Sequence, residues 1–244
     1  MTDMIPFPPA LEHGLPVEVF PDLFMVTGSM ETVLNAADWT FSRNMVIVRQ
    51  EGELTLVNTI RLDPEGLEAL NGLGTVRHVL RLGALHGRDD GFYQHTFGAK
   101  LWAPEGVNTE SSLTVDHRLR EGCACPLQDG SIFGFRTSKL PELILHLDRH
   151  GGILIACDAL QNWQLADPYF SEETRLLMAD LGYFQRANFG PLWRSLNDPS
   201  EEDFLRLEEL SFEHVLCGHG QPLLGGAKAA FTARRKQVFQ AGDA

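Results

Sequence analysis

Short apolar runs separated by polar segments predict strands and helices in turn along this chain. Residues 44–59 contain two β-rich runs that meet at Glu51 and Gly52, which predicts a hairpin because glycine tolerates the backbone conformation of a tight turn. Further strands are expected in HVLRLG ending at Gly83, KLWAP at 100–104, SIFGFRTS, LPELILHLD, the nearly all-apolar ILIACDAL, and HVLCG at 214–218.

Helices are expected between these strands. They are predicted in DPEGLEALNGL, over 171–182, over 200–210 and from about Gly226 onward. Ser200 and Asp203 come close to a capping box at the start of the third of these helices. Strands and helices in this order predict an α/β or α+β layered domain, and the chain has no repeat or linker, so one domain over 1–244 is expected.

Composition narrows the classes of partner. The 244 residues are 43% hydrophobic and carry a formal net charge of −13, which disfavours nucleic acid and anionic membrane surfaces as partners. No apolar run is long enough for a membrane span, and the first residues do not resemble a secretory signal. The four cysteines match neither a zinc knuckle nor a disulfide framework, so a cytoplasmic protein with reduced thiols is expected.

Three segments place His or Asp directly after an apolar strand. They are LGALHGRDDG at 82–91, ILIACDALQNW at 153–163 and HVLCGHGQPL at 214–223. Strand ends commonly gather ligands in layered α/β folds, so His86, Asp89 or Asp90, Asp158 and His219 are expected on one rim. Imidazole and carboxylate suit Zn, Fe or Mn. Singly, each residue also fits a structural role, such as a hydrogen-bonded histidine or a helix N-cap.

In this order the segments resemble the metallo-β-lactamase superfamily over roughly residues 18–240. CDALQNW is similar to the segment that bears the bridging Asp, and LCGHGQPLLGG is similar to the final Gly-His-Gly turn. LVNT is similar to the strand where relatives often have an Asp, although this chain has Asn58 there. The resemblance implies a four-layer αββα sandwich with metal ligands at its strand ends.

The resemblance also implies an incomplete ligand set. Aligned on His86, the His-x-His-x-Asp-His motif of the family keeps Asp90 but has Arg88 and Gly91 at its other two histidines. A later ligand expected near residues 135–139 is also missing. His86, Asp90, Asp158 and His219 survive of six ligands, with Asp89 as an alternative to Asp90, and they suffice for one divalent metal ion.

Arg88 cannot coordinate a metal, because guanidinium has only donors. We expect it to pair with Asp90 or Asp158 and to replace the charge of the missing ion. Arg88→His is then expected to raise the metal stoichiometry.

Two classes of function follow. In the first, the chain is a metal-dependent hydrolase of an ester, lactone, thioester or phosphodiester, with Asp90 as general base and Arg88 as a second candidate catalytic residue. The same site with iron would instead support oxygen chemistry. In the second, the chain is a metal-free pseudoenzyme or binding module. A small-molecule substrate is expected in the hydrolase case, and the oligomeric state stays open, a homo-oligomer included.

Overall fold

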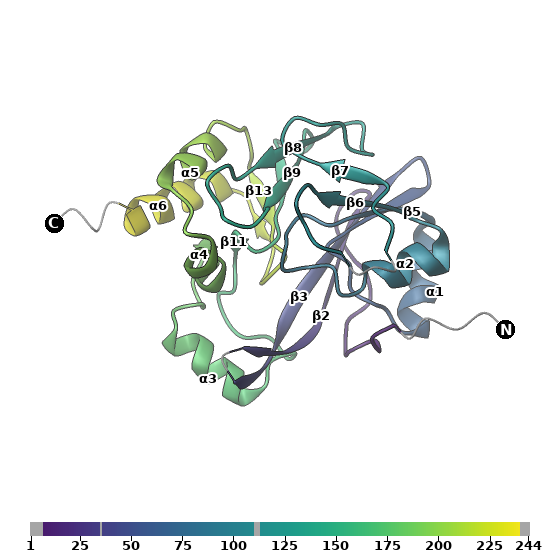
Figure 1. Cartoon of the computed structure of the whole chain (residues 1–244), viewed down its shortest axis with the longest axis horizontal. Helices are drawn as coiled ribbons and strands as arrows, with labels where there is room; N and C mark the ends of the chain where they lie inside the picture. Colours follow the sequence, from purple (N-terminus) through teal and green to yellow (C-terminus); the bar gives the residue numbers. More distant parts are fainter. Residues whose placement is uncertain (1–6, 35, 110–112, 240–244) are drawn as a thin grey trace.

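Two β-sheets lie face to face between two layers of helices in the computed structural model, which describes residues 7–34, 36–109 and 113–239 (Figure 1). The first sheet has the order β1-β2-β3-β4-β5-β6-β7, with bounds Val17–Phe20, Leu23–Leu34, Ala37–Gln50, Glu53–Val57, Thr75–Leu80, Lys100–Pro104 and His117–Leu119. The second has the order β14-β13-β10-β9-β8, with bounds Leu223–Leu224, His214–Leu216, Ile153–Ile155, Leu143–Leu147 and Gly130–Gly134.

Both faces of the first sheet are buried. Successive side chains of a strand point to opposite faces, and β2 shows this directly. Leu23 and Met25 pack between the two sheets, whereas Phe24 and Val26 pack toward α1 (Pro64–Leu73) and α2 (Asp90–Phe97). The helices therefore cover the outer face of this sheet.

Both faces of the second sheet are buried as well. Ile155 of β10 lies in the core between the sheets, and its neighbour Leu154 lies in the outer core with Phe204 and Phe231. Those aromatic residues belong to α5 (Glu201–Leu207) and α6 (Ala227–Phe239). The layers therefore run helix, sheet, sheet, helix, which confirms the expected αββα sandwich.

The predicted hairpin at residues 44–59 is confirmed, but its first strand is longer than expected. Glu51 and Gly52 both adopt positive φ, at 52° and 78°, as a two-residue hairpin turn requires. β3 begins at Ala37 and pairs with β2 as far as Val48, so a long β2–β3 hairpin extends beyond the sheet toward α3 (Glu172–Asp180) (Figure 1).

Some helices begin at the polar residues that usually cap helices, and others do not. Asp63 and Ser171 cap α1 and α3, because their side chains accept hydrogen bonds from the backbone N–H groups of Gly66 and Thr174. The capping box expected at Ser200 is wrong. Asp203 instead accepts from the backbone N–H groups of Arg136 and Thr137.

The sequence pattern did not predict α2, the short pair of β11 and β12 (Leu160–Gln161 with Asn188–Phe189) or α4 (Pro191–Asn197), although Leu160 ends a segment predicted as a strand. Within the described ranges, every helix is too short or too polar to cross a bilayer.

Candidate metal centre

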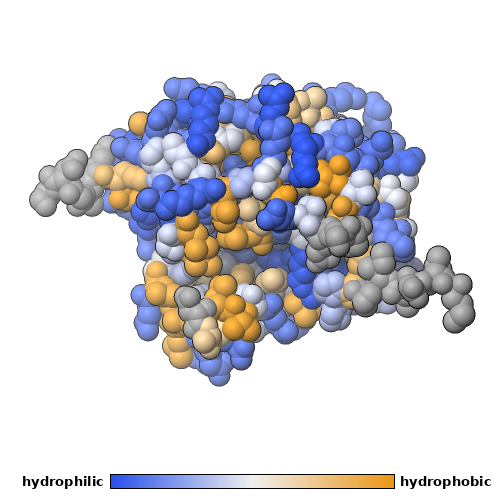
Figure 2. All heavy atoms as spheres, in the orientation of Figure 1, coloured by the Kyte–Doolittle hydropathy of each residue, from blue (hydrophilic) through white to orange (hydrophobic). Residues whose placement is uncertain are grey.

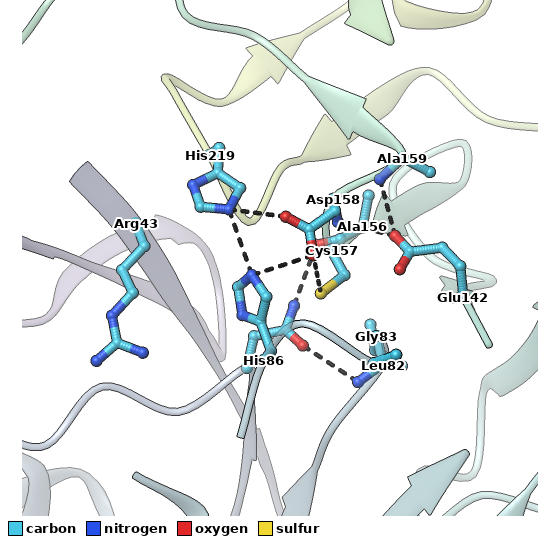
Figure 3. Close-up of polar contacts among 12 residues, drawn as sticks. Arg43, Leu82, Gly83, His86, Glu142, Ala156, Cys157, Asp158, Ala159 and His219 are labelled. Carbon is cyan, nitrogen blue, oxygen red and sulfur yellow. Dashed lines mark hydrogen bonds and ion pairs between the residues drawn. The ribbon is translucent and has the colours of Figure 1, made fainter. Parts of the chain in front are cut away.

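Three predicted ligands come together where strands of the two sheets end. His86 follows β5, Asp158 follows β10 and His219 follows β13. Their side chains point toward one another (Figure 3). His219 Nε2 lies 3.1 Å from Asp158 Oδ1 and 3.3 Å from His86 Nε2, and His86 Nε2 lies 3.5 Å from Asp158 Oδ2. The side chains of the three residues are between 6% and 11% exposed, so the cluster is largely shielded from water.

The Gly-His-Gly turn fixes His219 through close backbone packing. Gly220 has a φ of 90°, and a Cβ there would lie 2.3 Å from the backbone of Asn162 and Trp163. A Cβ at Gly218 would lie 2.8 Å from the carbonyl oxygen of Cys157. Only glycine fits both positions without displacing the loop that carries Asp158. The turn and the Asp158 loop are therefore packed as one unit.

The first sheet orients the His219 ring. Asn44 of β3 donates its side-chain amide to the carbonyl oxygens of Cys217 and Gly220, at 2.9 and 2.6 Å. His219 Nδ1 lies 3.1 Å from the carbonyl oxygen of Ser42, which can only accept, so Nδ1 carries the proton. Nε2 is then the atom that faces Asp158 and His86, as expected of an imidazole prepared to bind a metal.

Two buried side chains tie the other donor loops together. Asn58 accepts from the backbone N–H of Leu82 and donates to the carbonyl oxygen of Ala156, which joins the loops of His86 and Asp158. Glu142, at the start of β9, accepts from the backbone N–H groups of Asp158 and Ala159, both at 2.8 Å (Figure 3). Burial, with the nearby Asp158 carboxylate, raises the pKa of Glu142.

Glu142→Leu is expected to destabilise the fold by about 2–4 kcal/mol, because two buried N–H groups lose their acceptor. Glu142→Gln keeps the accepting oxygen and is the matched control, with an expected loss of less than about 1 kcal/mol. Urea unfolding of the two variants measures the difference. Equal stability of the Leu and Gln variants would show that the Glu142 carboxyl does not support the Asp158 loop.

The donor geometry fits a divalent ion. Zinc bonds of about 2.0–2.2 Å to nitrogen and oxygen give tetrahedral ligand–ligand edges of about 3.3–3.6 Å. The contacts among His86, Asp158 and His219 span 3.1 to 3.5 Å, with each histidine facing a different oxygen of Asp158. Burial alone would raise the pKa of Asp158, but the two histidines hold that pKa below its ordinary value, so the carboxylate keeps its charge. The residues present therefore fit one metal ion.

Cys157 adds a fourth candidate donor. Ligand atoms of His86, Cys157 and Asp158 lie within 4.8 Å of one another, and Cys157 Sγ is 3.6 Å from Asp158 Oδ2. Burial raises the pKa of the Cys157 thiol, and the neighbouring carboxyl groups of Asp158 and Glu142 raise it further. The sequence pattern favours a small buried apolar residue at Cys157, and its proximity to the donors becomes visible only in the structure.

Within the described residues, the two aspartates after His86 form no hydrogen bond or ion pair with the three donors. Asp90 accepts from the Thr59 hydroxyl at 2.7 Å, and burial raises the pKa of its carboxyl. Its other oxygen is buried without a hydrogen-bond partner among the described residues. Asp89 is the N-cap residue of α2, but its carboxylate accepts from Arg43, Arg88 and the backbone N–H of Arg61. Asp90 as a ligand or general base stays a prediction.

Arg88 pairs with a carboxylate, as expected, but with a different one. Arg88 Nη1 lies 2.7 Å from Asp89 Oδ1, whereas the sequence suggested Asp90 or Asp158. The difference arises from Arg43 of β3, which is buried and also pairs with Asp89. Asp89 is the next residue along the chain from Arg88, so its buried carboxylate is within reach of both guanidinium groups.

A cleft of about 300 Å³ opens in front of the donors, and its lining includes His86, Asp158, His219, Arg43 and Arg88. A smaller pocket of about 50 Å³ meets it at Asp158 and His219. Figure 2 shows hydrophobic side chains gathered around a hollow on this face, over α3, α4 and the tip of the β2–β3 hairpin. A concave, mostly apolar surface with a few converging polar groups is typical of a small-molecule site.

Solved structures with the same arrangement of layers are metallo-β-lactamases. The DIM-1 enzyme superposes with a TM-score of 0.61 at 13% identity, covering 95% of this chain and 100% of that one. The chain has the metallo-β-lactamase fold. FIM-1 from Pseudomonas aeruginosa in its mono-zinc form gives 0.59 at 15% identity, covering 95% and 98% of the two chains. The enzyme from Hirschia baltica gives 0.58 at 16%, covering 90% and 96%.

This chain has the same fold as these metallo-β-lactamases, although its sequence is only 13% to 16% identical to theirs. No family model and no curated protein matches the sequence. The site that this chain builds on the fold includes supports that the sequence did not reveal. Glu142 and Arg43 act through partners 16 and 46 positions away along the chain. In the sequence, the only sign of a role for Glu142 is that an acidic residue stands at the start of an apolar strand.

Proposed function

We propose that the protein is a hydrolase that uses one divalent metal ion held by His86, Asp158 and His219. The observation that carries the proposal is the triangle of residues His86, Asp158 and His219, which line a cleft and contact one another at 3.1 to 3.5 Å, each histidine against a different oxygen of Asp158. Three protein ligands and an open position characterise catalytic zinc sites, whereas structural sites are closed by four. A mono-zinc form has been crystallised for FIM-1, which has the same fold.

A bound ion would polarise a substrate oxygen and lower the pKa of water. The residues around the donors hold them in position for a metal ion. Ser42 and Asn44 hold His219 with Nε2 toward the cleft, and Glu142 positions the backbone of Asp158. The aromatic rings of Trp163 and Phe41 flank His219, at centroid distances of 5.0 and 5.8 Å, and limit the access of water. The proposed substrates are small esters, lactones or thioesters.

Metal analysis of full-length protein purified without chelator tests the proposal. We expect about one Zn, Fe or Mn ion for each chain, and less than a tenth of that in His219→Ala. His214→Ala is the matched control, because His214 lies on β13, the strand that precedes His219, and contacts the carbonyl oxygen of His150 instead of the donors. Hydrolysis of an ester, lactone, thioester and phosphodiester panel is expected only with loaded protein, and at least about 100-fold slower in His219→Ala.

Two other outcomes would replace the proposal. Two histidines and one carboxylate with open positions are also the ligands of non-haem Fe(II) oxygenases, and the three donors of this chain have that composition. Iron in the purified protein, with oxygen consumption and no hydrolysis, would favour that function. Protein that neither contains a metal nor gains thermal stability from added Zn, Fe or Mn would instead be a metal-free binding module.

A further inference from the structure

His86 depends on its own loop for its position more than the other two donors do. Ser42 accepts from Nδ1 of His219, and Glu142 accepts from the backbone of Asp158. A metal-binding histidine is usually oriented by a partner of its second nitrogen. Among the described residues, the polar contacts of the His86 ring are those of Nε2 with His219 and Asp158. The loop that carries His86 therefore has to hold it in place.

Arg81 holds the start of that loop. It directly follows β5, and its backbone N–H donates to the carbonyl oxygen of Trp102 at 2.9 Å, so the first sheet fixes its position. Its Nε donates to the carbonyl oxygen of Gly83 at 3.0 Å, and its Nη2 donates to that of Ala84 at 2.6 Å. The residue is 7% exposed, so water does not compete freely for these two carbonyl oxygens.

The same guanidinium contacts the loop beyond His86. Gly87 has a φ of 114°, and a Cβ there would lie 2.5 Å from Arg81 Nη1 and 2.6 Å from Arg81 Cζ. The backbone of Gly87 therefore packs closely on the guanidinium, and glycine is the residue that permits both this approach and this φ. One side chain thus contacts the loop two residues before His86 and one residue after it.

No other charged group takes Arg81 away from the loop. Among the described residues, the hydrogen-bond acceptors of its side chain are the two loop carbonyl oxygens, and it forms no ion pair. Burial lowers the pKa of Arg81, and the Asp90 carboxyl offsets part of that effect. A guanidinium is planar and presents several N–H donors in a fixed fork, so it can bind both carbonyl oxygens while its face stays against Gly87.

We infer that Arg81 is the positioning residue of His86 and holds its loop in the metal-binding conformation before an ion arrives. The inference rests on the metal centre of the proposed function and adds the residue that prepares one of its ligands. Among the described residues, Arg81 forms no hydrogen bond or ion pair with the donors themselves. A change at Arg81 is therefore expected to reach the ion through His86.

Arg81→Met tests the inference, because methionine fills much of the buried volume and removes the N–H donors. Calorimetric titration of the metal-free, full-length variant with Zn²⁺ is expected to show binding about 10–100-fold weaker than in the wild type. Arg81→Lys keeps the charge without the planar fork and is expected to recover part of the loss. Arg235→Met removes another buried arginine, which pairs with Glu201 and Glu208, and is expected to leave the zinc affinity unchanged.

Gly87→Ala reaches the same contact from the loop and keeps every donor of Arg81. Its Cβ would collide with the guanidinium, so we expect zinc binding to weaken by about tenfold or more. Gly98→Ala is the matched control. Gly98 also has a positive φ, of 65°, but a Cβ there would meet no atom within 4 Å, so zinc binding is expected to stay unchanged.

The visible absorption spectrum of bound Co²⁺ separates positioning from a general loss of stability. The number and geometry of the ligands determine that spectrum. Arg81→Met loaded with Co²⁺ is expected to shift toward the spectrum of His86→Ala, whereas Arg235→Met is expected to keep that of the wild type.

Hydrogen exchange of the metal-free protein gives a readout that needs no ion. The backbone N–H groups of residues 83–90 are expected to exchange at least about tenfold faster in Arg81→Met than in the wild type, because their loop loses its anchor. Residues 153–163 and 214–223, which carry the other donors, are expected to exchange at the rate of the wild type.

Unchanged zinc affinity, an unchanged Co²⁺ spectrum or unchanged exchange over residues 83–90 in Arg81→Met would overturn the inference. Equal effects in Arg235→Met would overturn it as well. If Arg81→Met does not fold, the same readouts of Arg81→Lys and Gly87→Ala decide. Wild-type protein that binds neither Zn²⁺ nor Co²⁺ would overturn the proposed hydrolase function, and faster exchange in Arg81→Met would then still identify Arg81 as the anchor of the loop.

Discussion

Asp158→Ala is expected to weaken zinc binding by at least about 100-fold, more than the loss of an outer hydrogen-bond partner of a metal ligand causes. Asp158 provides the only anionic oxygens in the triangle with His86 and His219, and both of its oxygens contribute to that triangle. Without it, two neutral imidazoles remain, too few to hold the ion in a defined geometry. Calorimetric titration of full-length protein with Zn²⁺ measures the change.

Thermal unfolding gives a second readout for Asp158→Ala. A ligand at 100 times its dissociation constant stabilises a protein by about 2.7 kcal/mol, so zinc should raise the melting temperature of the wild type and not of the variant. Cys157→Ser is the informative control, because it changes the neighbouring residue and keeps all three donors. If Cys157→Ser also loses zinc, the site has four protein ligands. If Asp158→Ala binds zinc as the wild type does, the triangle is not the metal centre.

Asp89→Leu is expected to lower the free energy of unfolding by about 3–5 kcal/mol, because it leaves the buried Arg43 without its charge partner. The side chains of Arg43 and Asp89 are 5% and 0% exposed, so water cannot replace the lost contact. The variant also removes the acceptor of the Arg61 backbone N–H. Chemical denaturation at neutral pH measures the loss.

Arg88→Gln provides the comparison for Asp89→Leu. Arg88 is 23% exposed and contacts the same carboxylate from the solvent side, so its loss is expected to cost about 1 kcal/mol or less. Similar stability losses in the two variants would mean that Asp89 does not compensate a buried charge. A stable Asp89→Leu protein would mean that Arg43 finds another acceptor or reaches solvent.

The strand-end segments could be read from the sequence because each has a local physical reason. An apolar strand followed by His or Asp, and glycines on both sides of His219, reflect buried backbone and close packing that only those residues permit. The order of the layers followed from the resemblance to the metallo-β-lactamase superfamily, because the pattern of strands and helices alone predicted only an α/β or α+β layered domain. The hairpin turn at Glu51 and Gly52 was equally local.

The ion-pair or hydrogen-bond partner of a charged side chain could not be predicted from the sequence in the same way. Asp89 and Asp90 are adjacent, yet one turns to Arg43 and the other to Thr59, because α2 begins between them and sends them to different neighbours. The helix α2 itself has a weak apolar pattern and was missed. Arg88 consequently received the wrong partner in the sequence-based prediction, although pairing with a carboxylate was foreseen.

The long β2–β3 hairpin separates two properties that many enzymes combine in one segment. The metal donors follow β5, β10 and β13, whereas Leu34, Trp39 and Phe41 of the hairpin contribute to the pocket wall. Changes near the hairpin tip can therefore alter which ligands the pocket accepts while His86, Asp158 and His219 stay in place. Exchange of the hairpin tip alone, with Ser42 and Asn44 kept to hold His219, is therefore a route to altered ligand preference, both in protein engineering and in natural divergence on this scaffold.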